Sequence, residues 1–162
     1  MTVLHNIPPV YNRESRILIL GSFPSVKSRE GRFFYHHPQN RFWQVLSAVL
    51  GCPAPGSIEE KKAMLTSHGI ALWDVIASCE ITGSSDSSIR SAVPNDVGRI
   101  AAEADLRAVF CNGQTAFRLY RRFLAPSLDL PAAALPSTSP ANAAWTLARL
   151  TEAWAAAIGP YF

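Results

Sequence analysis

Small polar residues follow three apolar runs of the chain, and together they could form a binding site. The three segments are Gly21-Ser-Phe-Pro-Ser25, Asn112-Gly113 and Leu135-Pro-Ser-Thr-Ser-Pro-Ala141. Their hydroxyl, amide and backbone N–H groups can bind a phosphate or the polar edge of a ligand. The sequence has no GxGxxG, GxxxxGK[ST], GxSxG or HExxH motif. The usual signals of dinucleotide, P-loop, serine-hydrolase and zincin chemistry are therefore absent.

A basic segment directly follows the first of these polar loops. It contains Lys27, Arg29, Arg32 and Arg41 against Glu30 alone, and the charges of the remaining chain cancel, so it accounts for the whole formal net charge of +3. A local positive patch is what a polyanion such as nucleic acid needs. The alternative is a solvated loop that happens to be basic.

Strands alternate with helices along the chain, which predicts an α/β fold: three α-β-α layers around a parallel sheet. The apolar runs predict strands at Arg16–Gly21, Ile70–Ala77, Arg107–Cys111 and Leu130–Leu135. Helices are expected at 41–50, from the Ser57/Glu60 capping box to about 68, at 94–104, at 114–124, and from Ser139 (N-cap) and Pro140 onward. Ser22–Asn40 and Thr82–Ser91 are expected to be loops. Because ligands bind beyond the carboxyl ends of parallel strands, the three polar segments should meet in one cleft.

Length and composition indicate one compact domain over residues 1–162, with 48% apolar and 17% charged residues. Three cysteines without a CxxC pair favour buried free thiols in a reducing cytoplasm over a disulfide framework or a zinc ribbon. We see no signal peptide, and the uncharged stretch 130–148 contains three prolines, so we expect no membrane span. We expect a monomer that needs neither metal nor cofactor.

Four motifs in order resemble the uracil-DNA glycosylase superfamily, and most of all its hypoxanthine-DNA glycosylase (DNA-deoxyinosine glycosylase) branch. They are GSFPS from Gly21, HPQNRFW from His37, CNGQTA from Cys111 and LPSTSPA from Leu135, and they span nearly the whole chain. The resemblance implies a four-stranded parallel sheet between helices and removal of a damaged base from double-stranded DNA without metal or cofactor.

Two departures from better-known branches favour the hypoxanthine branch. Phe23 stands where they carry an activating Asp or Asn, and Leu135 stands where the uracil-specific branch has His. Phe23 cannot hold a water molecule, and Leu135 cannot stabilise negative charge on a uracil oxygen. The resemblance therefore gives the catalytic role to Asn40, whose carbonyl could position the attacking water. A helix N-cap is the alternative for Asn40.

The resemblance also implies a set of contact residues. Tyr35 would stack on the extruded base, and Ser22, Phe23 and Asn112 would complete the base pocket. The DNA contacts would come from Ser25, Lys27, Arg29, Arg32, Arg41, Ser137, Thr138 and Ser139. Core packing is the alternative for Tyr35 and Phe23, and an Asn-Gly turn or helix cap is the alternative for Asn112.

Three questions stay open at this level. His36 and His37 could protonate a leaving purine, touch phosphate, or be ordinary loop residues. A glycosylase that also cleaves the DNA strand needs an amine that forms a Schiff base with the sugar. Lys27 is the only such candidate in the basic segment, which favours a monofunctional glycosylase. A broader or uracil-directed mismatch glycosylase, or a non-catalytic module that binds damaged DNA or a nucleotide, would share the same cleft.

Overall fold

A four-stranded parallel sheet forms the centre of the protein, as the computed structural model of all 162 residues shows. Its strands are β2 (Ile17–Gly21), β3 (Ile70–Asp74), β6 (Ala108–Asn112) and β7 (Ala132–Leu135), in the order β3-β2-β6-β7. All three pairings are parallel. Every residue of β2 and β3 is buried, as expected for strands covered on both faces. The predicted parallel sheet is confirmed.

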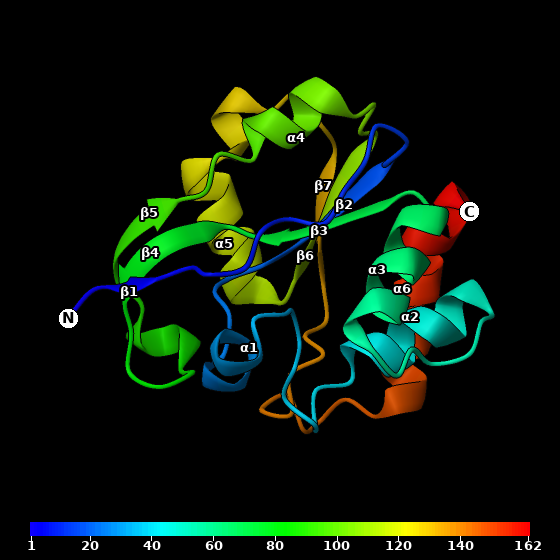
Figure 1. The fold of residues 1–162 in the computed structure, drawn as a ribbon, viewed down its shortest axis with the longest axis horizontal. Coiled ribbons are helices and arrows are strands. Elements are labelled where there is room, and N and C mark those ends of the chain that lie inside the picture. The colour runs from blue at the N-terminus through cyan, green and yellow to red at the C-terminus, as the bar shows by residue number, and fades with distance from the viewer.

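Helices cover both faces of this sheet and make the expected three layers (Figure 1). On one side, α5 (Gln114–Phe123) packs against β6 and β7, with α4 (Gly98–Glu103) near it. On the other side lie α2 (Phe42–Leu50), α3 (Ile58–Ser67) and α6 (Leu147–Ile158). The caps predicted for two helices are present: Ser57 accepts from the N–H of Glu60, and Gly51 closes α2 at a φ of 68°. No helix has the length and apolarity that crossing a bilayer requires.

A second, antiparallel sheet was not predicted. It contains β1 (Val3–Leu4), β4 (Ile76–Glu80) and β5 (Arg90–Pro94), in the order β1-β4-β5. The expected strand Ile70–Ala77 is two strands, because the chain leaves the parallel sheet at Val75 and enters the second sheet at once. No glycine or proline marks this change, so the apolar run reads as continuous. The side-chain amide of Asn95 holds the crossover by donating to the carbonyls of Asp74 and Ile76.

Two loop predictions and two helix predictions also need correction. The loop predicted at Thr82–Ser91 ends earlier, because its last two residues belong to β5. The segment Ser22–Asn40 contains a short helix, α1 (Val26–Gly31), which Ser25 caps by accepting from the N–H of Ser28. The last helix does not start at Ser139: α6 begins at Leu147, and Thr146 is its N-cap. Ser139 instead accepts from the N–H of Ala141 within a loop. The predicted helix 94–104 is likewise shorter, because its first residue, Pro94, ends β5.

Three 3-10 turns complete the chain, at Asp86–Ser88, Ala125–Ser127 and Gly159–Tyr161. All three cysteines are free: Cys79 and Cys111 are buried as expected, whereas Cys52 is only half-buried.

Candidate functional site

A cavity of about 330 Å³ lies at the carboxyl edge of the parallel sheet. Figure 1 shows α1, the cyan segment 32–41 and the orange segment 136–146 gathered at this edge, at the bottom of the view. The three polar segments predicted to converge do so. The predicted site residues that line the cavity are Ser22, Phe23, Ser25, Tyr35, Asn40, Asn112, Ser137, Thr138 and Ser139. The basic residues Lys27, Arg29, Arg32 and Arg41 do not line it.

Thr138 connects the two asparagines of the cavity. Its side chain is fully buried, and its hydroxyl donates to Oδ1 of Asn40 at 2.9 Å while accepting from Nδ2 of Asn112 at 3.0 Å. Its backbone N–H donates to Oδ1 of Asn112, and its carbonyl accepts from the N–H of Arg41. Thr138 thus fixes residues from three distant segments at one place.

These bonds determine which end of the Asn40 amide faces the cavity. Oδ1 accepts from the hydroxyl of Thr138 and also from the backbone N–H of Phe42, at 2.9 Å. A backbone N–H can only donate, and a carbonyl oxygen has two lone pairs, so the acceptor end of Asn40 is fully used. The amide nitrogen, which has no partner in the protein, is left for a ligand. The bond to Phe42 also caps the start of α2, one position before the N-cap residue Arg41, whose side chain makes no cap bond.

Asn112 has the same orientation for the same reason. The N–H of Thr138 occupies its oxygen, and Nδ2 has one hydrogen left after donating to the hydroxyl of Thr138. The sequence suggested that this amide could offer a donor and an acceptor to a base edge. In the structure one N–H of the amide is free, and Thr138 already uses one of the two lone pairs of its oxygen.

Aromatic rings form one wall of the cavity. The ring of Tyr35 stacks on Phe42 at 4.1 Å between centroids, and its backbone has a φ of 51°, which is unusual for a residue of this size. Its hydroxyl is buried without a hydrogen-bond partner, and burial, together with the charge of Asp74, raises its pKa far above the ordinary value. Phe23 packs edge-on against His5.

An acidic corner completes the cavity, and the sequence reasoning missed it. Asp74 is 3% exposed and receives a hydrogen bond of 2.8 Å on Oδ2 from Nε2 of His5. Asp86 lies nearby and accepts at 2.8 Å from the hydroxyl of Ser22. Burial raises the pKa of Asp86, although the bond from Ser22 opposes the shift. The sequence did contain a signal for Asp74, because this charged residue ends the apolar run of β3. The predicted strand Ile70–Ala77 continued past Asp74, so the residue was taken as part of a strand interior.

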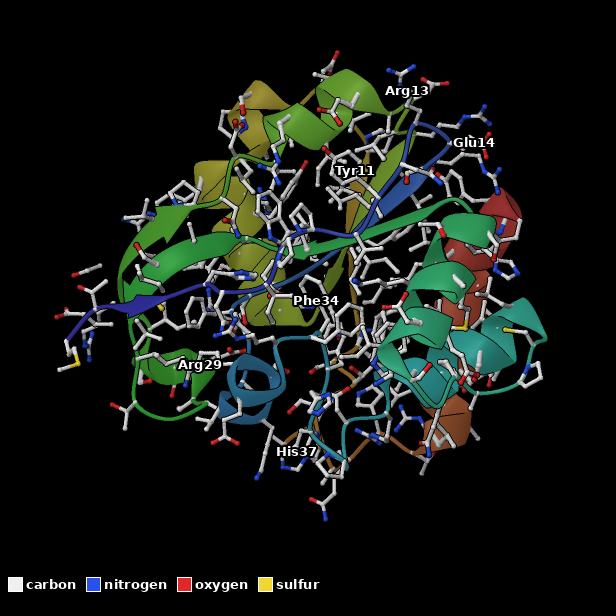
Figure 2. The ribbon with its side chains drawn as sticks, viewed as in Figure 1. Tyr11, Arg13, Glu14, Arg29, Phe34 and His37 are labelled. Carbon is white, nitrogen blue, oxygen red and sulfur yellow. The ribbon has the colours of Figure 1, made fainter.

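The two histidines of the HHP sequence are placed differently. His37 lines the cavity, and its Nδ1 accepts from the N–H of Gln39, so the neutral ring carries its proton on Nε2. His36 is exposed and packs near Gly31 instead. Figure 2 shows His37 at the lower edge of the molecule.

Two of the four basic residues are directed inward. The guanidinium of Arg41 donates to the carbonyls of Ser139, Asn142 and Trp145 and so holds the loop that precedes α6. These bonds explain why the Ser-Pro pair starts no helix, since the carbonyls that would begin it turn toward Arg41.

Arg29 donates to the carbonyl of Gly83 and lies over the ring of Phe23. Only Lys27 and Arg32 have exposed side chains, and Lys27 pairs loosely with Glu30 at 3.8 Å. The positive charge available to a polyanion is therefore smaller than the sequence suggested.

The serine hydroxyls of the two motifs mostly serve the local backbone. Ser137 accepts from the N–H of Ser139, and Ser25 accepts from the N–H of Ser28 while donating to the hydroxyl of Ser28. Ser137 and Ser139 keep a hydroxyl hydrogen that could still reach a phosphate. Groups of three or more His, Cys, Asp or Glu side chains that could hold a metal ion do not occur.

The cavity therefore presents two amide donors, one free carboxylate oxygen on Asp74 and an aromatic wall. Such a surface suits a small planar ligand with adjacent hydrogen-bonding groups, and its volume is at the lower end for ligand sites.

Comparison with known proteins identifies the family of the chain. The family model for the uracil DNA glycosylase superfamily matches residues 8–158. The chain is 32% identical to a hypoxanthine DNA glycosylase of Methanosarcina acetivorans over 93% of its own length and 95% of that protein. A hypoxanthine DNA glycosylase of Methanosarcina barkeri is 31% identical over 66% of this chain and 69% of its own. A solution NMR structure from Methanosarcina acetivorans, provisionally described as a uracil DNA glycosylase, superposes with a TM-score of 0.84 at 31% identity over 99% of both chains.

Proposed function

The chain belongs to the uracil DNA glycosylase superfamily, and we propose that it is a DNA glycosylase that removes a deaminated base from double-stranded DNA. Hypoxanthine is the base we propose first, because two relatives of more than 30% identity are hypoxanthine DNA glycosylases. The product would be an abasic site.

The observation that carries this proposal is the pair of amide nitrogens that Thr138 fixes in the cavity. To reach the glycosidic bond, such an enzyme must flip the nucleotide out of the duplex into a pocket. The cavity at the carboxyl edge is large enough for a small ligand and is lined mostly by polar residues. Tyr35 lines this cavity, which supports the stacking role that we propose for its ring.

Bond cleavage passes through a sugar with oxocarbenium character, so electrons move onto the departing base. Preorganised N–H donors directed at that base stabilise the developing negative charge. We propose this role for Nδ2 of Asn40, assisted by Nδ2 of Asn112. The water-positioning role suggested by the sequence requires the Asn40 oxygen, which is already occupied by two donors.

Contacts to the DNA backbone would come from groups at and around the cavity. Lys27 and Arg32 provide charge, and Ser137 and Ser139 provide hydroxyl groups, whereas the hydroxyl hydrogen of Ser25 is already donated to Ser28. We also propose that the enzyme is monofunctional. Lys27 lies outside the cavity beside Glu30, so no lysine is placed to form a Schiff base with the sugar.

The direct test is a panel of otherwise identical duplexes that contain hypoxanthine, uracil, xanthine or only normal bases. The purified protein is incubated with each duplex, and abasic sites are then cleaved with alkali. We expect strand breaks at hypoxanthine, and none without the alkali step if the enzyme is monofunctional. Stronger excision of uracil would support the uracil-directed alternative, which the solved relative favours. Binding to damaged duplexes without release of any base would leave only a binding module.

A further inference from the structure

We propose that Asp86 is a catalytic carboxylate that positions the attacking water and stabilises the cationic sugar at the open side of the cavity. This inference rests on the proposed function. It begins from a group that the reaction needs and that the residues described so far do not supply. The oxygen of Asn40 already accepts two hydrogen bonds, so another residue must accept from the water.

Asp86 lies where the sugar of a flipped nucleotide would stand. The residue is exposed, and it lines both the cavity of about 330 Å³ and a neighbouring cavity of about 510 Å³. A base that enters the cavity points inward, whereas its sugar stays at the open side because the DNA backbone holds it. An exposed residue in the wall therefore faces the sugar rather than the base.

Contacts with α1 hold the turn Asp86–Ser88 at this place. The hydroxyl of Ser84 accepts from the backbone N–H of Val26 at 2.9 Å, and Arg29 donates to the carbonyl of Gly83 at 3.1 Å. Figure 1 shows this turn, in green, beside α1. The segment that joins β4 to β5 thus carries its carboxylate to the cavity.

Ser22 fixes one oxygen of the carboxylate and leaves the other free. The hydroxyl of Ser22 donates to Oδ1 of Asp86 at 2.8 Å. Oδ2 has no hydrogen-bond partner in the protein and is not among the buried unpartnered atoms, so it can accept from a water molecule. The carboxylate is therefore held in direction and keeps an acceptor.

The charge of Asp86 opposes binding of DNA but favours the reaction. A carboxylate near the phosphates repels them, so its position at this edge calls for an explanation. As the bond between C1′ and the base breaks, the electron pair goes to the base and the sugar becomes cationic. The amide donors of Asn40 and Asn112 would face the negative base, and the carboxylate would face the positive sugar. Each of the two charges that the reaction separates thus meets a group of opposite polarity.

The next step consumes one water molecule. The water oxygen forms a bond to C1′, and one water proton passes to Oδ2 of Asp86, from which solvent removes it. The base leaves with the electron pair of the broken bond and takes up a proton from solvent. The products are the free base and an abasic site with a hydroxyl group on C1′.

The surroundings of Asp86 predict a pH dependence. Partial burial raises its pKa, the bond from Ser22 opposes this shift, Asp74 raises the pKa further, and Arg118 lowers it. The other titratable or charged groups near the turn are Arg29, Tyr35, His37 and Cys79. Since the ionised carboxylate is the active form, the rate should fall as the pH falls through this raised pKa.

The test is Asp86→Asn, which keeps the size and the acceptor for Ser22 but removes the charge. Single-turnover release of hypoxanthine is measured across about pH 4–9 with protein in excess, and release without protein is subtracted. The variant should be slower by about 10²-fold at neutral pH and should lose the fall in rate at acidic pH. A fall that belongs to Asp74 or His37 would remain in the variant.

Binding gives a second readout that a merely structural role would not produce. Affinity is measured for a duplex whose deoxyinosine carries fluorine at C2′, because fluorine destabilises the cationic sugar and so prevents cleavage. Asp86→Asn should bind this duplex at least as tightly as the wild type, since a charge that repels the phosphates is gone. A variant that only distorts the turn would bind more weakly and would unfold at a lower temperature.

Two further variants complete the design. Asp105→Asn removes an exposed carboxylate at the amino-terminal side of β6 and should leave rate, affinity and pH profile unchanged. Ser22→Ala removes the bond that lowers the pKa of Asp86, so the fall in rate should move to higher pH. If Asp86→Asn does not fold, this movement decides the matter.

A folded Asp86→Asn protein that releases hypoxanthine at the wild-type rate, or that keeps the acidic fall in rate, overturns the inference but leaves the proposed function intact. An acidic fall that stays in place in Ser22→Ala does the same. If the wild-type protein releases no base from any duplex, the proposed function itself is wrong.

Discussion

Replacement of Asn40 by Asp separates the two ends of this side chain. Aspartate keeps an oxygen where Phe42 and Thr138 donate, but it places a second oxygen where the NH₂ group faces the cavity. If the NH₂ group stabilises the departing base, Asn40→Asp should lower single-turnover excision of hypoxanthine by about 10²–10³-fold, the usual effect of losing one preorganised donor. Affinity for the duplex should change little, because phosphate contacts dominate it.

Stability distinguishes this variant from Asn40→Ala. Alanine removes the acceptor for the first N–H of α2 and leaves the hydroxyl hydrogen of Thr138 unpaired. The expected loss is about 1–2 kcal/mol, which lowers the Tm of a domain of this size by roughly 2–8 °C. Aspartate retains both bonds and should have a Tm close to that of the wild type.

The assay is therefore a pair of measurements on three proteins: rapid-quench excision with enzyme in excess, and thermal unfolding by circular dichroism. Loss of rate in both variants with loss of Tm only in Asn40→Ala is the expected pattern. A folded Asn40→Asp protein that excises hypoxanthine at the wild-type rate would refute the donor role. Wild-type rates in both variants would reduce Asn40 to a helix cap.

Three further outcomes are expected. Reversal of Lys27 and Arg32 to Glu should weaken binding to all duplexes and lower the slope of log K against log salt by about two. The control Arg13→Glu, far from α1 in the view of Figures 1 and 2, should leave the slope unchanged. A slope of the double variant equal to that of the wild type would mean that the basic segment does not contact DNA. Burial raises the pKa of the Cys111 thiol to about 12, so this thiol is protonated at pH 8. Iodoacetamide should therefore modify the half-buried Cys52 and spare Cys111 in the folded protein, which mass spectrometry can measure. Rapid labelling of Cys111 would contradict its burial. Excision should be unchanged by EDTA, since no three potential ligands gather in the fold; loss of activity that added metal restores would disprove this.

The parallel sheet could be predicted because three of its strands, β2, β3 and β6, are short continuous apolar runs, whereas β7 is an alanine-rich edge strand that is partly exposed. Burial on both faces imposes that pattern directly on the sequence. The second sheet could not be predicted, because β4 continues the apolar run of β3 and β1 has only two residues. Local patterns do not show where a chain passes from one sheet to another.

The candidate site was predictable in position but not in detail. The motifs indicated Asn40 and Asn112, yet the direction of the Asn112 amide depends on the backbone N–H of Thr138, and Thr138 also provides the second donor to the Asn40 oxygen. Thr138 lies far along the chain from both. The sequence also could not show that Arg41 would be used to hold a loop. The sequence also could not show that His5 would hydrogen-bond to Asp74, because the two residues are 69 positions apart and no local spacing links them.

The bond between Thr138 and Asn40 joins residues 98 positions apart, and the contacts of Arg41 with the loop before α6 span about as far. A nascent chain that has not yet emerged to this loop lacks the Thr138 hydroxyl that holds Asn40 and the carbonyls that hold Arg41. The last motif of the chain therefore completes the cavity, and chains that stop before this loop would lack a working site.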